Sequence, residues 1–509
     1  MYDNFESLIR IRRSVFSEVA KLAYDGDYAR IEEIPYQLLN SEAKKNGQAK
    51  YRESIFLERA IVAERIRLAI GLPVRSADEH SPISKGIEEA TTTKRFYEPP
   101  LINIIDFACN ACPTDSYFVS NVCVGCLANP CRNVCPKNAI SIVNGRSHIN
   151  QDLCIKCGRC KDVCPYGAII HRERPCQKAC GMDAIESDEY GKAKINYDKC
   201  VSCGMCLVNC PFGAIADKSQ IFQVIQTIKS ETPVYAIMAP SFVGQFGPKV
   251  NLATIEDAMS KLGFDGTFEV SVGADLCTIE EAKDFLEEVP SKLKFMGTSC
   301  CPSWSVMAKT LYPEFKENIS MALTPMVLTA RLIKKEHPEG KIVFVGPCSA
   351  KKLEASRKSV RSDVDFVLTF EELMGMFVAK NVDFNTLVAK PLKNESSAAG
   401  RGFAVAGGVA NAVVEACKHL DPNREIKVKA TQGLRNCRNM LADAKKGLYD
   451  GYLLEGMACP FGCASGAGTI TQPTKTKALV GLSQKETPLK SSLDSKYKKD
   501  LEELEERGV

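Results

Sequence analysis

The segment TSCCPSW, residues 298–304, places two cysteines side by side, Cys300 and Cys301. Two further motifs follow: GPCSAKK at residues 346–352, with Cys348, and EGMACPFGC at residues 455–463, with Cys459 and Cys463. The three motifs are far apart in sequence, so only a folded domain can bring them together. A thiolate set of this kind suits a cubane iron–sulfur cluster. We therefore expect a metal centre built from distant segments of one domain.

Length and composition restrict the class of protein. A chain of 509 residues can hold about two to four domains. The formal net charge of +4 is small for this size, and no arginine-rich patch with interleaved aromatics indicates a nucleic-acid partner. No run reaches the ~18 apolar residues of a membrane span. We therefore expect neither nucleic acid nor membrane as a partner.

Cysteine is the unusual component. The chain has 24 cysteines, and sixteen of them lie between Cys109 and Cys210. A disulfide scaffold is the simplest explanation of such density, but those chains are short, and the regular CxxCxxC spacing favours metal. Reduced thiols then imply a reducing, cytoplasmic compartment.

Four regions are predicted. Residues 1–105 contain no cysteine and repeat apolar residues at helical spacing, which indicates an N-terminal helical domain. Residues 106–220 are cysteine-rich. Residues 221–485 alternate apolar β-rich runs with helical stretches, which predicts an α/β domain with parallel sheets flanked by helices. Residues 486–509 form a C-terminal helical tail, expected to be charged and solvated.

Several secondary-structure elements of the α/β region can be assigned in advance. Four strands are expected, at residues 234–238, 294–296, 342–345 and 452–454, and two of the helices are expected at 254–261 and 371–378. Several of these runs end directly in a chemical motif. Parallel sheets place their sites at the carboxyl ends of strands, so the motifs are expected at sheet edges.

The cysteine-rich region is a tandem repeat. CIKCGRCKDVCP at residues 154–165 and CVSCGMCLVNCP at 200–211 both resemble the bacterial ferredoxin signature, in which three cysteines hold one cubane and the fourth ligates its neighbour. This predicts a ferredoxin-like α+β iron–sulfur domain that acts as an electron wire. The repeat predicts four cysteine sets: Cys123, Cys126, Cys131 and Cys164; Cys135, Cys154, Cys157 and Cys160; Cys180, Cys200, Cys203 and Cys206; and Cys109, Cys112, Cys176 and Cys210.

Two alternatives stay open for this region. The fourth set is the weakest, because it groups the four cysteines that the other three sets leave over, and Cys109 and Cys112 precede the first repeat. Two, three or four accessory clusters are therefore possible. Zinc bound by CxxC knuckles is the other alternative, most of all for Cys109, Cys112 and Cys176.

The motifs of residues 233–475 resemble those of the iron-only (FeFe) hydrogenases. In that family four cysteines bind a cubane, and one of them bridges to a diiron unit with carbon monoxide, cyanide and an azadithiolate. The resemblance implies the ligands Cys301, Cys348, Cys459 and Cys463, with Cys463 as the bridge. It also implies a catalytic domain that interconverts protons plus electrons and molecular hydrogen. Ferredoxin or flavodoxin as electron carrier, and maturation proteins for the diiron unit, follow by the same analogy.

The resemblance extends to the pocket and to a proton relay. It implies hydrogen bonds to the cyanides from Ser241 and Lys351, and an apolar wall from Met457, Phe403 and Pro325. It implies a relay that begins at Cys300 and continues through Glu281, Ser320 and Asp284. Without the resemblance, Met457 and Phe403 would be core residues, and Glu281 and Asp284 a solvated helix face.

Some positions depart from the family pattern, which indicates a divergent member. Three residues and one loop near the expected diiron unit differ from that pattern: Gly346, Met326, Ser303 and the loop 465–473. Glu288 stands where the relay often ends in an arginine. A non-catalytic iron–sulfur scaffold or assembly protein, or a hydrogen sensor, remains the alternative, although a scaffold would not need Cys300 and Lys351. Three cysteines without partner motifs, Cys277, Cys417 and Cys437, are interpreted as packing residues.

Overall fold

Two parallel sheets form the centre of the second half of the chain. The computed structural model describes residues 6–42 and 49–506, apart from 77, 79, 358, 359, 361 and 394. The first sheet has the order β10-β9-β12-β13 and the second the order β11-β15-β14. Their strands are β9 (Val234–Met238), β10 (Gly266–Glu269), β11 (Met296–Gly297), β12 (Lys341–Gly346), β13 (Phe366–Thr369), β14 (Lys427–Gln432) and β15 (Tyr452–Met457).

Helices flank both sheets, so most central strands are continuous apolar runs rather than alternating ones. The helices of this region are α10 (Ile255–Ser260), α11 (Ser271–Glu288), α12 (Pro302–Leu311), α13 (Pro325–Glu336), α14 (Ala350–Ser356), α15 (Phe370–Ala379), α16 (Ala398–Gly402), α17 (Gly408–Leu420), α18 (Leu434–Ala444) and α19 (Pro473–Glu486). The predicted architecture of parallel sheets flanked by helices is confirmed. The strand predicted at 294–296 starts only at Met296 and has two residues.

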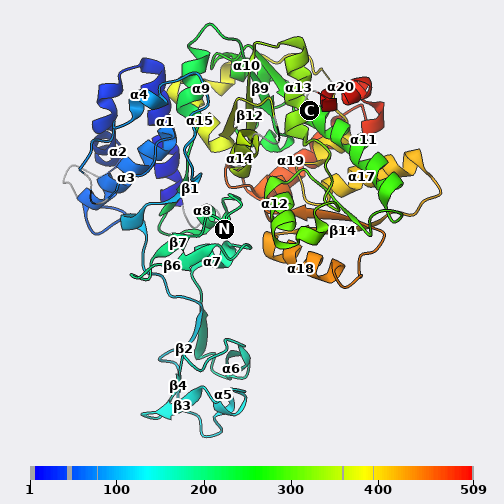
Figure 1. The fold of residues 1–509 in the computed structure, drawn as a ribbon. Coiled ribbons are helices and arrows are strands. Elements are labelled where there is room, and N and C mark those ends of the chain that lie inside the picture. Colours follow the sequence, from blue (N-terminus) through cyan, green and yellow to red (C-terminus); the bar gives the residue numbers. More distant parts are fainter. Residues whose placement is uncertain are drawn as a thin grey trace.

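Two small α+β units make up the cysteine-rich region. The first contains β2 (Ser116–Val119), α5 (Pro130–Asn133), β3 (Ile140–Val143), β4 (Arg146–Ile149), α6 (Arg159–Asp162) and β5 (Ile169–Arg172). The second contains α7 (Pro175–Ala179), β6 (Ile185–Ser187), β7 (Ala193–Ile195), α8 (Met205–Asn209) and β8 (Ile215–Asp217), and β8 pairs with β1 (Ile102–Ile104). Figure 1 shows the first unit projecting from the body, whereas the second lies against it.

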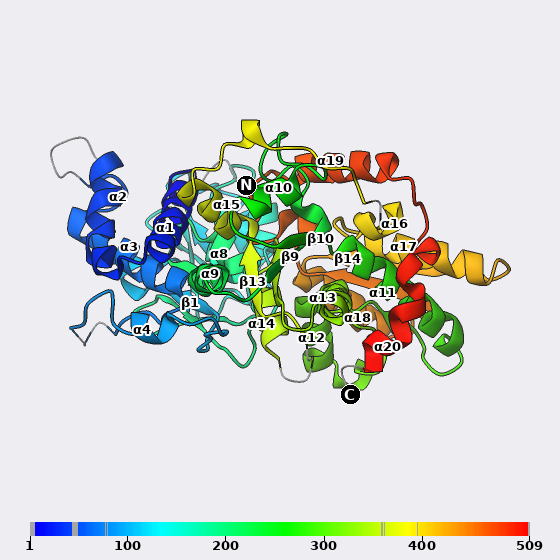
Figure 2. The same cartoon turned by 90° about the horizontal axis from the view of Figure 1, so that it is seen from above.

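The N-terminal helices share a core with the first sheet. They are α1 (Glu6–Asp25), α2 (Ile34–Glu42), α3 (Ile55–Ile70) and α4 (Ile87–Ala90). Val19 and Ile66 belong to the same apolar cluster as Val343 of β12 and Phe370 of α15. Figure 2 shows these helices on one side of the body and α17 on the other, with β9 and β13 between them. The helical region is therefore continuous with the sheet.

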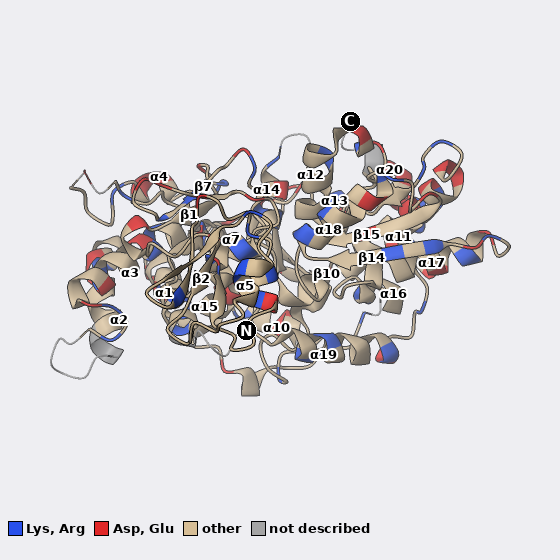
Figure 3. Cartoon of the chain, turned by 90° about the horizontal axis from the view of Figure 1, so that it is seen from below, with Lys and Arg blue, Asp and Glu red and all other residues tan. Residues whose placement is uncertain are grey.

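The C-terminal tail differs from the expectation of a solvated helix. Leu501 and Leu504 of α20 (Leu501–Glu506) are buried, and Arg331 donates a hydrogen bond to the Leu504 carbonyl at 2.6 Å. The expectation is wrong there because two leucines three residues apart turn to the protein under a charged outer face. Figure 3 shows Lys and Arg interspersed with Asp and Glu along the helices of one face. Among the described helices, none has the length and apolar character that crossing a membrane requires.

Candidate metal centre and active site

A cavity of about 80 Å³ lies where the cysteine motifs meet. The motifs follow the carboxyl ends of β11, β12 and β15, and Ser241 follows β9, so segments distant in sequence reach one place. Ten predicted residues line the cavity: Cys300, Cys301, Cys348, Cys459, Cys463, Ser241, Pro325, Lys351, Phe403 and Met457. Met457 and Phe403 are both buried and both line the cavity, so each of them is a core residue and a pocket residue at once.

Local packing explains how TSCCPSW reaches the cavity. Pro302 starts helix α12, where its missing N–H is not needed, so the chain turns directly after Cys301. Trp304 is fully buried, and its indole Nε1 donates to the Thr298 carbonyl at 3.0 Å. A Cβ at Gly456 would lie 2.1 Å from the Trp304 ring, so this glycine allows β15 to pass close to the motif. The tryptophan therefore holds two of the motifs together.

Lys351 presents a cation at the cavity wall. Its Nζ lies 2.7 Å from Glu354 Oε2 and donates to Thr324 Oγ1 at 3.3 Å. Burial lowers the pKa of Lys351, but the Glu354 carboxylate outweighs this and raises it above its usual value. Neither Glu354 nor Thr324 was predicted from the sequence. The i,i+3 spacing of Lys351 and Glu354 on a helix could have indicated the first of them.

Ser241 supplies the observation that tests whether a group fits this cavity. The residue is fully buried, and its Oγ has no hydrogen-bond partner among the described residues. Leaving a buried hydroxyl unsatisfied is costly, typically ~1–3 kcal/mol. Together with Lys351 it gives two donors beside thiols in an apolar cavity. This donor set fits a metal group that carries anionic hydrogen-bond acceptors.

The four predicted relay residues lie at different depths. Glu281 of α11 is fully buried, and Ser320 is nearly so, whereas Asp284 is half-buried one helical turn further on. A solvated face is therefore excluded for Glu281. Burial, followed by the Glu281 carboxylate, raises the pKa of the Cys300 thiol well above its usual value.

Ser299 is a functional candidate that was not predicted from the sequence. Its backbone N donates to Glu281 Oε1 at 2.8 Å and its Oγ donates to the same atom at 3.0 Å. Burial nevertheless raises the pKa of Glu281 to about 7. The carboxyl group is thus held by one oxygen and titrates near neutral pH. Only the tertiary structure shows this contact, because eighteen residues separate the partners.

The sixteen cysteines of the repeat are divided between the two iron–sulfur units. In the first unit, one cavity is lined by Cys123, Cys126, Cys131 and Cys164, and another by Cys135, Cys154, Cys157 and Cys160. In the second unit, burial and the neighbouring thiols raise the pKa of Cys206, and those thiols include Cys180, Cys200 and Cys203. Within the described part of the chain, no three Cys, His, Asp or Glu side chains group closely enough for a single metal ion.

The cysteines of the fourth set also raise one another's pKa. Burial, followed by the Cys210 thiolate, raises the pKa of Cys176 to about 12, and Cys109 acts in the same direction. Cys109 and Cys210 both raise the pKa of Cys112 after burial. Cys203 of the third set also lines the main cavity, so the third set adjoins it.

The structure shows the contacts or burial of four residues that depart from the family pattern. Ser303 Oγ donates to the Val201 carbonyl at 3.1 Å and so ties α12 to the second iron–sulfur unit. A Cβ at Gly346 would lie 2.5 Å from the Phe344 ring, and Met326 is buried in the cavity wall. Glu288 is half-buried at the end of α11.

Comparisons with known proteins agree with this site. Residues 232–467 match the family model "Iron only hydrogenase large subunit, C-terminal domain". Residues 147–170 match "4Fe-4S binding domain", and residues 170–221 match "LdpA Fe-S cluster-binding domain".

Two curated relatives and one solved structure illustrate the range of similar proteins. Iron hydrogenase 1 of Clostridium pasteurianum is 29% identical over 422 residues, which is 72% of this chain and 73% of that protein. The nuclear prelamin A recognition factor of Xenopus laevis is 26% identical over 292 residues, 46% of this chain and 64% of that protein. A solved FeFe-hydrogenase is 21% identical with a TM-score of 0.45, covering 53% of this chain and 89% of that one. Residues 232–467 are therefore similar to the C-terminal domain of the iron-only (FeFe) hydrogenases, from which they diverge in sequence.

Proposed function

We propose that this chain is a hydrogenase that reversibly interconverts protons plus electrons and molecular hydrogen, at a six-iron site fed by four accessory 4Fe-4S clusters. One observation carries the proposal. The four proposed ligand thiols, a buried hydroxyl with no hydrogen-bond partner among the described residues, and a buried ammonium share one largely apolar cavity.

The residues of this cavity divide into ligands, donors and walls. Cys301, Cys348, Cys459 and Cys463 would hold a cubane, with Cys463 bridging to the diiron unit. That unit, with its carbon monoxide, cyanide and azadithiolate, supplies the exchange of electrons with hydrogen when bound. Lys351 Nζ and Ser241 Oγ would donate hydrogen bonds to the cyanides. The apolar side chains keep water out, so protons enter only along a defined path; these side chains are Met457, Phe403 and Pro325.

Protons reach the cavity through the chain's own groups. Cys300 lines the cavity and exchanges a proton with Glu281, whose pKa near 7 suits transfer in both directions at neutral pH. Ser299 holds one oxygen of that carboxyl group and leaves the other available. Ser320 and the half-buried Asp284 continue the path toward solvent.

Electrons arrive through the cysteine sets. The third set adjoins the main cavity through Cys203, and the first unit, with two sets, projects from the body (Figure 1). A soluble one-electron carrier such as ferredoxin or flavodoxin is the partner we propose. We also propose a cytoplasmic location and maturation proteins that deliver the diiron unit.

The test is spectroscopic and kinetic. The full chain is matured with the diiron unit, purified without oxygen and assayed for hydrogen evolution with reduced methyl viologen. We expect activity, infrared bands of bound carbonyl and cyanide, and about twenty-two irons per chain. The matched control is Cys463→Ala, which should lose the infrared bands and keep the accessory clusters. A matured chain without activity and without these bands would refute the proposal.

The second candidate is a non-catalytic iron–sulfur scaffold or assembly protein. A relative from Aedes aegypti, 26% identical over 276 residues and named as a probable cytosolic Fe-S cluster assembly factor, favours it. A scaffold has no use for a thiol, a lysine and an unpartnered serine around one cavity, so Cys300, Lys351 and Ser241 favour catalysis. The same assay separates the two candidates. A hydrogen sensor would also carry the infrared bands but would turn over slowly.

A further inference from the structure

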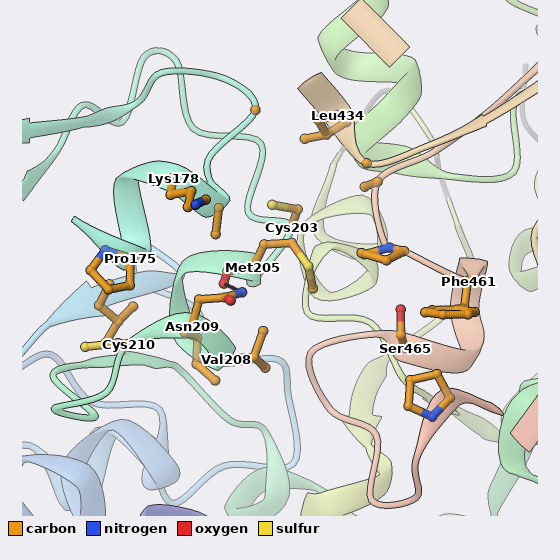
Figure 4. Close-up of a pocket in the computed structure, with 18 of the residues that line it drawn as sticks. Pro175, Lys178, Cys203, Met205, Val208, Asn209, Cys210, Leu434, Phe461 and Ser465 are labelled. Atoms are coloured by element: carbon orange, nitrogen blue, oxygen red, sulfur yellow. Dashed lines mark hydrogen bonds between the residues drawn. The ribbon is translucent and has the colours of Figure 1, made fainter. Parts of the chain in front are cut away.

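Helix α3 of the N-terminal region packs directly on the fourth cysteine set. Ile61 and Leu68 of this helix share an apolar cluster with Ala214, and Cys109 and Cys210 pack against that cluster. The helix therefore covers one side of the place where these cysteines meet. On another side, Cys210 lines a cavity of about 790 Å³ between the second iron–sulfur unit and the catalytic domain (Figure 4).

Two arginines of the N-terminal region hold the loops beside these cysteines. The Arg65 guanidinium, on α3, donates through Nη2 to the Gly213 carbonyl, three residues after Cys210. The Arg52 guanidinium donates to the Phe212 carbonyl and, at 3.2 Å, to the Ala108 carbonyl. A Cβ at Gly213 would lie 2.8 Å from Arg65 Nη2, so this glycine allows the close approach.

Arg65 places a charge at a largely buried position. The residue is 8% exposed and lines the same cavity as Cys210. Burial and the nearby Arg12 lower the pKa of Arg65 to about 10, and the Cys210 thiolate acts in the opposite direction. The guanidinium is therefore still protonated at neutral pH. A charge in such surroundings acts on its neighbours more strongly than a charge in water.

We propose that Arg65 raises the reduction potential of the 4Fe-4S cluster held by Cys109, Cys112, Cys176 and Cys210, so that the N-terminal helices tune one step of the electron path. This inference rests on the cluster set of the proposed function. One-electron reduction adds one negative charge to the cluster and forms no bond, so a buried cation favours the reduced form. The apolar cover of α3 disfavours that form by excluding water, and Arg65 offsets this effect.

The experiment compares the wild-type full chain with four variants by redox titration monitored by electron paramagnetic resonance, with dithionite and mediators. Arg65→Gln removes the charge and keeps a donor, whereas Arg65→Lys keeps the charge and loses the guanidinium. Arg59→Gln is the matched control, because this arginine of the same helix stacks on the Tyr36 ring at 4.4 Å. The signal lost in Cys176→Ala identifies the fourth cluster.

We expect Arg65→Gln to lower the reduced-to-oxidised ratio of this cluster at least about tenfold at a fixed potential, a shift of ~59 mV. Arg65→Lys should shift less, and Arg59→Gln should not shift. Iron content shows that each variant retains its clusters. An unshifted midpoint in Arg65→Gln, or equal shifts in both Arg65 variants, would overturn the role of the charge. If Cys176→Ala removes no signal, the cluster assignment itself is overturned, and the inference with it.

Discussion

Lys352 forms a buried set of ion pairs, so the effect of replacing it on stability can be predicted from the structure. Its Nζ lies 2.9 Å from Asp217 Oδ2 and 2.7 Å from Glu372 Oε1, and it donates to the Lys218 carbonyl at 2.9 Å. The Lys352 side chain is 2% exposed and that of Glu372 is fully buried. Asp217 belongs to β8 of the second iron–sulfur unit, whereas Lys352 belongs to α14, which follows Cys348. The ammonium therefore joins the iron–sulfur domain to a ligand-bearing segment.

The substitution Lys352→Met leaves the buried Glu372 carboxylate and the partly exposed Asp217 carboxylate without their cation. Removing one partner of a buried ion pair costs about 3–5 kcal/mol. We expect this loss in the local stability of α14, measured by native-state hydrogen exchange of its backbone amides. A cost of ~3 kcal/mol corresponds to at least about a hundredfold faster exchange. Adding Glu372→Gln should restore part of the protection, because a neutral amide then replaces one of the two unpaired carboxylates. The amide oxygen can still accept the capping hydrogen bond from the Thr369 backbone at the start of α15.

The control is Lys335→Met. Lys335 also contacts two carboxylates, of Asp500 and Glu503, but its side chain is exposed, so exchange in α14 should not change. If Lys352→Met changes the protection of α14 by less than about threefold, the buried triad does not stabilise this segment and the reasoning fails.

Three further outcomes follow from the cavity. Cys300→Ala should lower hydrogen evolution by at least about a hundredfold at unchanged iron content; full activity would remove this thiol from the relay. Ser241→Ala should shift the cyanide infrared bands of the matured chain yet leave the thermal stability of the cluster-free chain unchanged or higher, because the hydroxyl has no partner there. Burial raises the pKa of Glu281 from 4.5 to about 7, so its stabilising contribution is present below pH 4.5 and is lost as the pH rises to 7. Relative to Glu281→Gln, cluster-free wild type should therefore lose about 3 kcal/mol across this window in melting experiments; parallel curves would contradict the shift.

The repeat and the motifs could be interpreted from the amino-acid sequence alone. Their spacing reflects a local requirement, because a cubane takes three ligands from one short loop and the turn residues between them are close in sequence. The strands at 234–238 and 342–345 were predictable for a similar reason, since a strand buried on both faces must be a continuous apolar run.

Contacts between distant segments had no such signal. Three such contacts are those of Ser299 with Glu281, of Thr324 with Lys351 and of Arg65 with Gly213. Each joins polar residues of ordinary type, and only their burial gives them importance. The buried leucines of the charged C-terminal helix were mistaken for a solvated face for the same reason. Residue types and short spacings thus specified the chemistry of this chain. The tertiary fold determined which charged groups and hydroxyls are removed from water, and in the low-dielectric interior this burial determines how strongly these groups interact with their neighbours.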